Sequence, residues 1–267
     1  GRRECGMKKS GTFGLSQDTV ERLLNFASPV ILLLIWELCA RFGVIDVRFF
    51  PAPSKIFTQF MVMVENGQLW KHFWASMQRL FWGFLFGGVP ALMLGVAMGL
   101  SRPLRMLVEP IVSATYPVPK SAILPLVLLI FGLGESSKIV MVGIGIFFPI
   151  VINAMAGVLE IQKIYFDVSQ NFGASRWQVF RTVALPGAMP LILTGVKLGI
   201  GMGLVLISIA EMVGAKSGLG FMMWNAWEIL SVETMYVGLI VIAVLGIVFS
   251  QIVTEIERLI VPWRNAR

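Results

Sequence analysis

The segment DVSQNFGASRWQVFRTVALP, residues 167–186, decides how this chain of 267 residues is organised, because it is a polar stretch between two long apolar runs. The run before it covers about 139–159, and the run after it covers about 190–209. A connection as long as 160–189 is uncommon unless it has a function or is disordered. Residues 160–189 are therefore expected to fold outside the apolar layer and to serve a purpose of their own.

Two short helices are predicted within residues 160–189. The first is expected to end at Gly173, since glycine readily adopts the left-handed conformation that caps helices. The second is expected to begin after Ser175, a favourable N-cap, and to carry Trp177 and Phe180 at helical spacing. Pro186 is expected to end it. Such a helix pair either packs on lipid or docks a soluble partner, and the pattern alone leaves both open.

The composition of the chain excludes a water-soluble fold. Apolar residues make up 57% of the chain and charged residues only 14%, whereas soluble domains carry about 25% charged residues. The mean hydropathy is +0.81. A bilayer accommodates this much apolar surface because lipid is the solvent for the outer face. The expected fold class is all-α, with one polytopic membrane domain.

Six apolar runs have the character of transmembrane helices. They cover about 28–44, 80–100, 106–131, 139–159, 190–209 and 236–252. The third run cannot be one straight helix, because it contains Pro110, Pro117, Pro119 and Pro125. Broken backbone is tolerated at membrane depth only where protein or a water-filled cavity covers it. We therefore expect six spans, the third of them bent.

The distribution of lysine and arginine sets the expected orientation. Basic residues gather in both tails, in the loop after the second run and in 160–189, which six spans place on one side. We expect a cytoplasmic tail with an amphipathic start at 1–27, a six-span domain at 28–260 and a cytoplasmic tail at 261–267. The net charge of +7 suits a lipid bilayer with an anionic inner leaflet. Nucleic acid is not an expected partner, because the basic residues are spread between apolar runs.

Residues 167–186 resemble the EAA loop of binding-protein-dependent ABC importer permeases. In that pattern the triplet E-A-A is followed by three residues, a glycine, nine residues, an isoleucine, one residue and Leu-Pro. Gly173, Val183, Leu185 and Pro186 stand at the matching positions. The triplet itself is replaced by DVS at 167–169, which keeps the acid and loses the alanines.

Further segments resemble the nitrate, sulfonate, taurine and bicarbonate branch of that family. They include FFPAPSKIF at 49–57, PVPKSAILPLVLLIFGLGESSK at 117–138, LTGVKLGIG at 193–201 and AEMVGAKSGLGFMMWNA at 210–226. The resemblance covers about 49–260. It implies a six-span MetI-like permease in the bacterial inner membrane, usually a homodimer, with cytoplasmic ATP-binding subunits and an extracytoplasmic substrate-binding protein.

The resemblance also implies a role for residues 160–189, which would couple the permease to its ATP-binding subunits. The residues expected to take part are Asp167, Ser169, Gly173, Ala174, Ser175, Arg176, Trp177, Leu185 and Pro186. The function implied is ATP-driven import of a small substrate by alternating access. A small anion such as nitrate, bicarbonate or a sulfonate is expected, and a neutral or cationic substrate in the same importer class remains open.

The chain itself is not expected to be an enzyme. GAKSG at 214–218 is the nearest approach to a Walker A motif, and it lacks the Gly-Lys pair and the upstream glycine of a phosphate cradle. ATP and magnesium are therefore expected on the partner subunit, and this chain is expected to bind no cofactor. Cys5 and Cys39 are the only cysteines, so neither a disulfide framework nor a metal site is expected.

Four polar residues within the runs are candidates for lining the translocation path: Lys120, Asn153, Lys197 and Glu211. Intramembrane charges are costly and usually face an interior or a wet cavity. Each lysine could attract an anionic substrate. The structural alternative is that Lys120 binds backbone carbonyls freed by the prolines, and that Lys197 snorkels to the cytoplasmic interface. Asn153 either lines the path or bonds to a neighbouring helix. Glu211 could pair with Lys216, shape the outer gate or sit in the path itself, and a structural pairing is favoured.

Two other classes of protein were weighed against an importer permease. An ion-gradient secondary transporter would be expected to hold more paired carboxylates inside the membrane, where Glu211 is nearly alone. A simple membrane anchor for a cytoplasmic complex would not need four prolines in one span. His72 stands beside aromatic residues, and we expect it at the membrane interface rather than in a ligand site.

Overall fold

The computed structural model describes the backbone of residues 17–262 and the side chains of residues 27–262. Of the predicted tails, 1–16 and 263–267 therefore lie outside the described residues. The chain divides into two compact units, the first ending at Thr58 and the second beginning at Gln59. The two units are described separately.

The first unit contains helix α1 (Gln17–Arg41) and the beginning of α2 (Pro53–Glu65). Glu37 and Arg41, four residues apart on α1, form an ion pair in which Arg41 Nε lies 2.6 Å from Glu37 Oε1. Ser54 also binds Glu37, with its amide at 3.0 Å and its hydroxyl at 2.8 Å. The Glu37 carboxylate thus fastens the start of α2 to the end of α1. The first predicted apolar run falls largely within α1.

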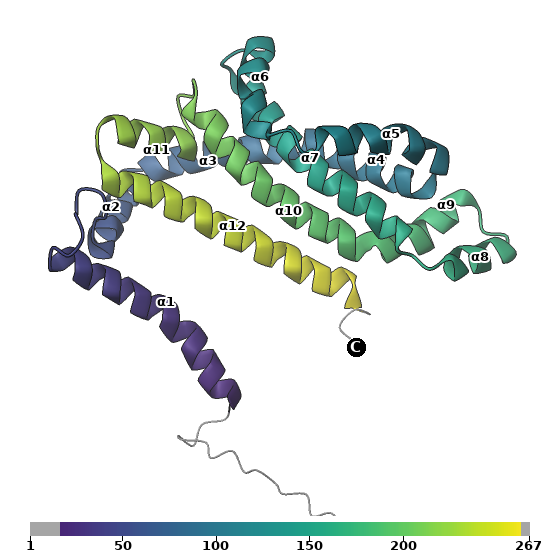
Figure 1. The fold of residues 1–267 in the computed structure, drawn as a ribbon, viewed down its shortest axis with the longest axis horizontal. Helices are drawn as coiled ribbons and strands as arrows, with labels where there is room; N and C mark the ends of the chain where they lie inside the picture. Colours follow the sequence, from purple (N-terminus) through teal and green to yellow (C-terminus); the bar gives the residue numbers. More distant parts are fainter. Residues whose placement is uncertain (1–16, 263–267) are drawn as a thin grey trace, which may run out of the picture. The chain divides into compact units, whose positions relative to one another are not determined.

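The second unit is built from long apolar helices and short connecting ones (Figure 1). The long ones are the continuous stretch of α3 (Gln68–Gly83), η1 (Phe84–Gly88) and α4 (Val89–Leu100), then α7 (Glu135–Leu159), then α9 (Arg176–Val179), η3 (Phe180–Ala184) and α10 (Leu185–Met212), and last α12 (Val232–Ile260). The short helices are α5 (Arg102–Thr115), η2 (Lys120–Ile123), α6 (Leu124–Phe131), α8 (Lys163–Asn171) and α11 (Leu219–Glu228). Among the described residues, four helical stretches are long and apolar enough to cross a membrane, or five if a bent pair counts as one span.

That bent pair is the third predicted run, and its predicted break is confirmed. Helix α5 and the stretch 120–131 meet at an angle of 88°. The break falls at residues 116–119, which contain Pro117 and Pro119. Pro110 lies inside α5, and Pro125 lies in the first turn of α6, where a missing N–H is harmless. Only two of the four prolines therefore stand at the break.

The prediction that Pro186 ends a helix is wrong. The helix that Ser175 begins continues through Pro186 and Pro190 to Met212, so the fifth span starts before residue 190. The five-residue π-helical turn of η3 precedes Pro186 directly. The i to i+5 hydrogen bonds of this turn let the helix continue through Pro186, which has no backbone N–H to donate. The segment 160–189 is thus joined rigidly to α10.

The centre of the second unit is α7, which packs between α4 and α10 with very close backbone approaches. Figure 1 shows α10 running between α7 and α12. Glycines permit this closeness, as small residues do in membrane helix pairs. A Cβ added to Gly95 would lie 2.5 Å from the Val151 carbonyl oxygen, and one added to Gly195 would lie 2.9 Å from the Pro149 carbonyl oxygen. These contacts make α4, α7 and α10 one packed body.

Gly87→Val is expected to destabilise this packed body. A Cβ at Gly87 would lie 2.5 Å from the Cα atom of Gly143, and backbone cannot move aside as a side chain can. Overpacking of this kind costs about 1–3 kcal/mol. Gly201→Val is the matched control, because a Cβ there meets nothing within 4 Å. The measurement is the melting temperature of the detergent-solubilised protein, and equal melting temperatures for the two variants would contradict the packing described.

Candidate functional site

The segment 160–189 forms the predicted pair of short helices, α8 and α9. Between them Gly173 has φ +71°, the left-handed conformation expected of it. Ser175 caps α9 by a reciprocal pair of bonds: its hydroxyl accepts from the Gln178 amide at 3.3 Å, and its own amide donates to Gln178 Oε1 at 2.7 Å. Both capping predictions are confirmed.

This segment presents large apolar side chains that the described chain does not cover. Phe172 is 87% exposed and Trp177 67% exposed, and Ile164 and Tyr165 are also exposed. Trp177 stacks on Phe180 with ring centroids 5.3 Å apart, so its indole is held in a fixed place. A rigid, exposed aromatic patch is the composition of a protein-binding surface.

The other residues predicted for coupling lie on the same short helices or where they join α10. Asp167 and Ser169 are half-buried on α8, and the Ser169 hydroxyl donates to the Phe166 carbonyl at 2.7 Å. Ala174 and Arg176 flank Ser175 at the turn. Leu185 and Pro186 form the first turn of α10. The structure thus brings the predicted set together along one segment of the chain.

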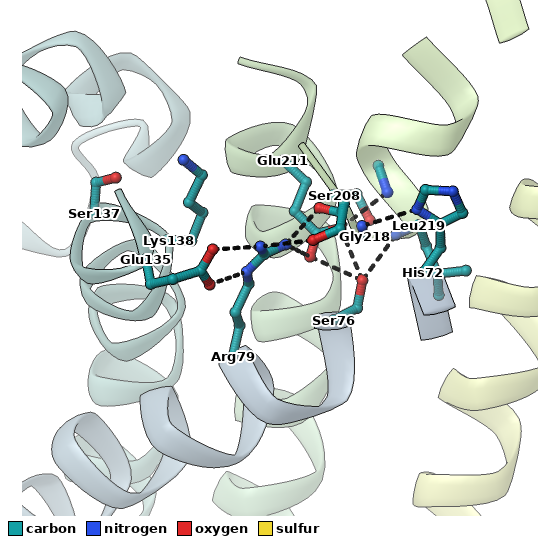
Figure 2. Close-up of polar contacts among 12 residues, drawn as sticks. His72, Ser76, Arg79, Glu135, Ser137, Lys138, Ser208, Glu211, Gly218 and Leu219 are labelled. Atoms are coloured by element: carbon teal, nitrogen blue, oxygen red, sulfur yellow. Dashed lines mark hydrogen bonds and ion pairs between the residues drawn. The ribbon is translucent and has the colours of Figure 1, made fainter. Parts of the chain in front are cut away.

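A buried polar network lies at the opposite end of α7 and α10 (Figure 2). Its centre is Arg79 of α3, which is 3% exposed. The guanidinium donates two bonds to Glu135 at the start of α7, at 2.5 and 2.6 Å, and one to Glu211 at the end of α10, at 2.8 Å. It also donates to the Ser217 carbonyl at 2.7 Å. One side chain therefore ties three spans and the loop after α10.

The Glu211 carboxylate is fully buried and fully hydrogen-bonded within this network. Besides Arg79, it accepts from the Ser76 hydroxyl at 2.8 Å and from the Gly220 amide at 2.9 Å. Ser76 in turn accepts from the Leu219 amide at 2.8 Å. A buried charge is tolerated only with such partners. The carboxylate therefore holds the start of α11 against α3 and α10.

The network corrects one expectation about this end of the molecule. Glu211 pairs with Arg79 and not with Lys216. His72 is packed against protein: it is 6% exposed, and its Nδ1 accepts from the Gly218 amide at 3.1 Å. The sequence contained a signal for this network, because His72, Ser76 and Arg79 are spaced four and three residues apart and share one helix face. Their aromatic neighbours concealed that pattern.

Lys120 lies at the bend of the third span, with every N–H donor of its ammonium engaged. It donates to the carbonyls of Thr115 at 3.0 Å, Tyr116 at 2.6 Å and Val118 at 2.8 Å. The ammonium also lies 4.2 Å from the ring centroid of Phe148. Lys120 thus binds the carbonyls that the proline break frees, and a contact with substrate stays a prediction.

Of the other two candidates for the translocation path, Lys197 lies near the middle of α10 and Asn153 lies six residues before the end of α7. Asn153 donates to the Pro149 carbonyl of its own helix at 2.8 Å. Lys197 donates to the Thr254 hydroxyl of α12 at 2.8 Å. Both side chains are half-buried. The structure does not bring Lys120, Asn153, Lys197 and Glu211 into one site.

Comparison with known proteins places this architecture in a family. Residues 91–263 match the model of the family described as the binding-protein-dependent transport system inner membrane component. The chain is 36% identical to the taurine transport system permease protein TauC of Escherichia coli over 251 residues, with 91% of this chain and 90% of that protein covered. It is 35% identical to the putative aliphatic sulfonates transport permease protein SsuC of Escherichia coli, with 92% and 93% covered. It is 29% identical to the nitrate import permease protein NrtB of a Synechocystis strain, with 87% and 86% covered.

The solved structures agree at the level of the fold. A chain of the MetNI methionine ABC transporter in an inward-facing conformation superposes with a TM-score of 0.63 at 22% identity, covering 73% of this chain and 98% of that one. The helical architecture is therefore that of the MetI-like importer permeases.

This chain belongs to the family of binding-protein-dependent transport system inner membrane components. It is the permease component of an ABC importer, and it is not the enzyme of that importer. ATP hydrolysis lies in separate subunits, and the family works with ATP-binding subunits and a substrate-binding protein. The place of such a component is the inner membrane.

Proposed function

We propose that this permease imports a small anion by alternating access. The observation that carries the proposal is its full-length similarity to permeases named for taurine, aliphatic sulfonates and nitrate. These three compounds share a negatively charged oxyanion group. The path would run along the bent third span and the spans of α7 and α10.

The assembly proposed is a homodimer of this chain with two ATP-binding subunits and an extracytoplasmic binding protein. The ATP-binding subunits would dock on 160–189, whose exposed Phe172 and Trp177 suit a protein partner. ATP and magnesium would be held by those subunits. The binding protein would dock at the end where Arg79 and Glu211 lie. The rigid continuity of α9 with α10 supports transmission of movement from one end to the other.

We also propose that both termini and the segment 160–189 face the cytoplasm. The support is the excess of lysine and arginine on that side of the six predicted spans. In this arrangement the tails at 1–27 and 261–267 and the coupling segment share one compartment, and the Arg79 network lies at the outer end of the bundle.

Cysteine labelling tests this orientation. Cys5 and Cys39 are first replaced by serine, and single cysteines are then introduced as Lys55→Cys and Arg176→Cys, both at exposed positions. A membrane-impermeant maleimide added to intact cells is expected to modify the first and to leave the second unmodified until the cells are opened. The reverse pattern would overturn the orientation.

Uptake by the reconstituted complex tests the function itself. The permease, its ATP-binding subunits and its binding protein are placed in proteoliposomes with ATP inside, and radiolabelled taurine, ethanesulfonate or nitrate is added outside. At least one anion should accumulate only with both ATP and the binding protein. Import of none of the three, with import of a neutral or cationic compound, would contradict the proposed substrate class.

A further inference from the structure

Lys197 carries a positive charge deep inside a membrane span. It lies 12 residues after Leu185 and 15 residues before Met212, the two ends of α10. At a rise of about 1.5 Å per residue it is roughly 18 Å from one end and 22 Å from the other. The hydrocarbon core is about 30 Å thick, so its centre is about 15 Å from water on either side. A lysine side chain is shorter than that, so an ammonium at the centre of the hydrocarbon core would not reach an interface by snorkelling.

The hydrogen-bonding capacity of this ammonium is largely unused. Of its three N–H donors, one binds the Thr254 hydroxyl at 2.8 Å. The Thr254 hydroxyl donates its own hydrogen bond to the Ser250 carbonyl, also at 2.8 Å, and it carries no charge. Within the described part of the chain, Lys197 has no carboxylate partner. Two N–H donors and an unpaired positive charge are therefore available to bind another group.

Three buried cations of the second unit have more of their donors engaged than Lys197. Arg79 holds two carboxylates, and Lys120 holds three backbone carbonyls. Lys138, 1% exposed, donates to the carbonyls of Leu133 and Gly214. Lys197 has one hydrogen bond within the described chain, fewer than any of these three. An unneutralised intramembrane charge marks a path for an ion or substrate more often than it marks packing.

The side of α10 next to Lys197 is open in the described second unit. Gly201 is one turn further along α10, on the same face, and a Cβ added there would meet nothing within 4 Å. Leu198 and Val205, on the adjoining face, are 53% and 54% exposed. The described second unit therefore leaves this side of α10 uncovered next to the ammonium.

We infer that the Lys197 ammonium is the contact that the oxyanion group of the substrate makes midway through the membrane. This inference rests on the proposed function and names the residue that selects for negative charge. Two N–H donors match two oxygens of a sulfonate, nitrate or carboxylate group. A single ammonium binds such a group without the bidentate geometry of arginine, so the contact is brief enough to permit release.

Uptake by the reconstituted complex, with whichever of taurine, ethanesulfonate and nitrate the unaltered permease imports, tests the inference. Lys197→Met removes the charge and keeps the shape, and it should lower the initial rate by about tenfold or more, since a charged hydrogen bond is lost. Lys197→Arg retains the charge and should keep most of the rate. The affinity of the binding protein for the anion, measured by calorimetry, should be the same throughout.

Thr254→Val separates a substrate contact from a structural one. It removes the one hydrogen-bond partner that the ammonium has among the described residues and leaves the charge in place. If Lys197 served only to join α10 to α12, Thr254→Val would lower uptake as much as Lys197→Met. The inference requires instead that Thr254→Val stays close to the unaltered rate. An equal loss in both variants, or an unaltered rate in Lys197→Met, overturns it.

If Lys197→Met does not assemble, Gly201→Val tests the substrate contact of Lys197 instead. It adds an isopropyl group beside the ammonium without touching the packed face of α10. Slower uptake with normal assembly is expected, and an unaltered rate would overturn the inference. A permease that imports none of the three anions would instead contradict the proposed function, so the two failures are distinguishable.

Discussion

Arg79→Met is expected to abolish assembly of the complex, or nearly so. The guanidinium is 3% exposed and, among the described residues, is the only cation bound to the Glu211 carboxylate, which has no exposure of its own. Removing one partner of a buried ion pair costs about 3–5 kcal/mol, because the other charge stays buried without compensation. That is a large share of the roughly 5–15 kcal/mol that holds a domain folded. The measurement is the yield and melting temperature of the purified complex.

A second substitution shows whether the unpaired charge is the cause. Arg79→Met combined with Glu211→Gln removes both charges, and the amide oxygen of glutamine can still accept from Ser76 and Gly220. The double variant should therefore recover much of the yield that the single variant loses. Glu135→Gln alone should be mild, because the Glu135 side chain is 65% exposed and remains hydrated. A double variant no better than Arg79→Met would contradict the ion-pair explanation.

Gly173→Val is expected to uncouple ATP hydrolysis from transport. Gly173 has φ +71°, and a β-branched residue strongly resists that conformation. A Cβ there meets nothing within 4 Å, so the effect must come from the backbone and not from a clash. The turn would reopen and move the aromatic patch of Phe172 and Trp177 relative to α10. Uptake should fall severalfold while the ATP-binding subunits retain their basal hydrolysis.

Asparagine at the same position is the matched control. Asparagine tolerates the left-handed conformation better than other non-glycine residues. Gly173→Asn should therefore transport faster than Gly173→Val although its side chain is larger and polar. The measurement is substrate-stimulated ATP hydrolysis beside uptake in the same vesicles. Equal loss in both variants would mean that the open space at Gly173, and not its backbone conformation, matters to the partner.

Local signals in the sequence predicted the parts of the fold that depend on short-range physics. The cap at Gly173, the capping box at Ser175 and the break near Pro117 and Pro119 were all predictable, because each follows from the conformational limits of a few neighbouring residues. The apolar runs predicted the spans for the same reason, since bilayer thickness acts on each helix separately.

Contacts between distant parts of the chain were not predictable in this way. Arg79 and Glu211 are 132 residues apart, and nothing local to either residue identifies the other. The prediction for Pro186 was wrong because the sequence alone does not distinguish a proline that ends a helix from one that a helix continues through. The π-helical turn before Pro186, which lets the helix continue, is visible only in the structure. Lys120 and Lys197 are both lysines within apolar runs, and the sequence does not distinguish their roles. In the structure the Lys120 ammonium donates three hydrogen bonds and the Lys197 ammonium donates one.

Cross-linking between this chain and its ATP-binding subunit tests most directly whether that subunit drives transport through its contact with residues 160–189. Single cysteines introduced as Phe172→Cys and Lys216→Cys, in a chain without Cys5 and Cys39, place a photoreactive probe at each end of the bundle. The probe at position 172 is predicted to capture the ATP-binding subunit, with a yield that changes when ATP is added, and the probe at position 216 is predicted not to capture it. Capture of the ATP-binding subunit from position 216 and none from position 172 would contradict the account.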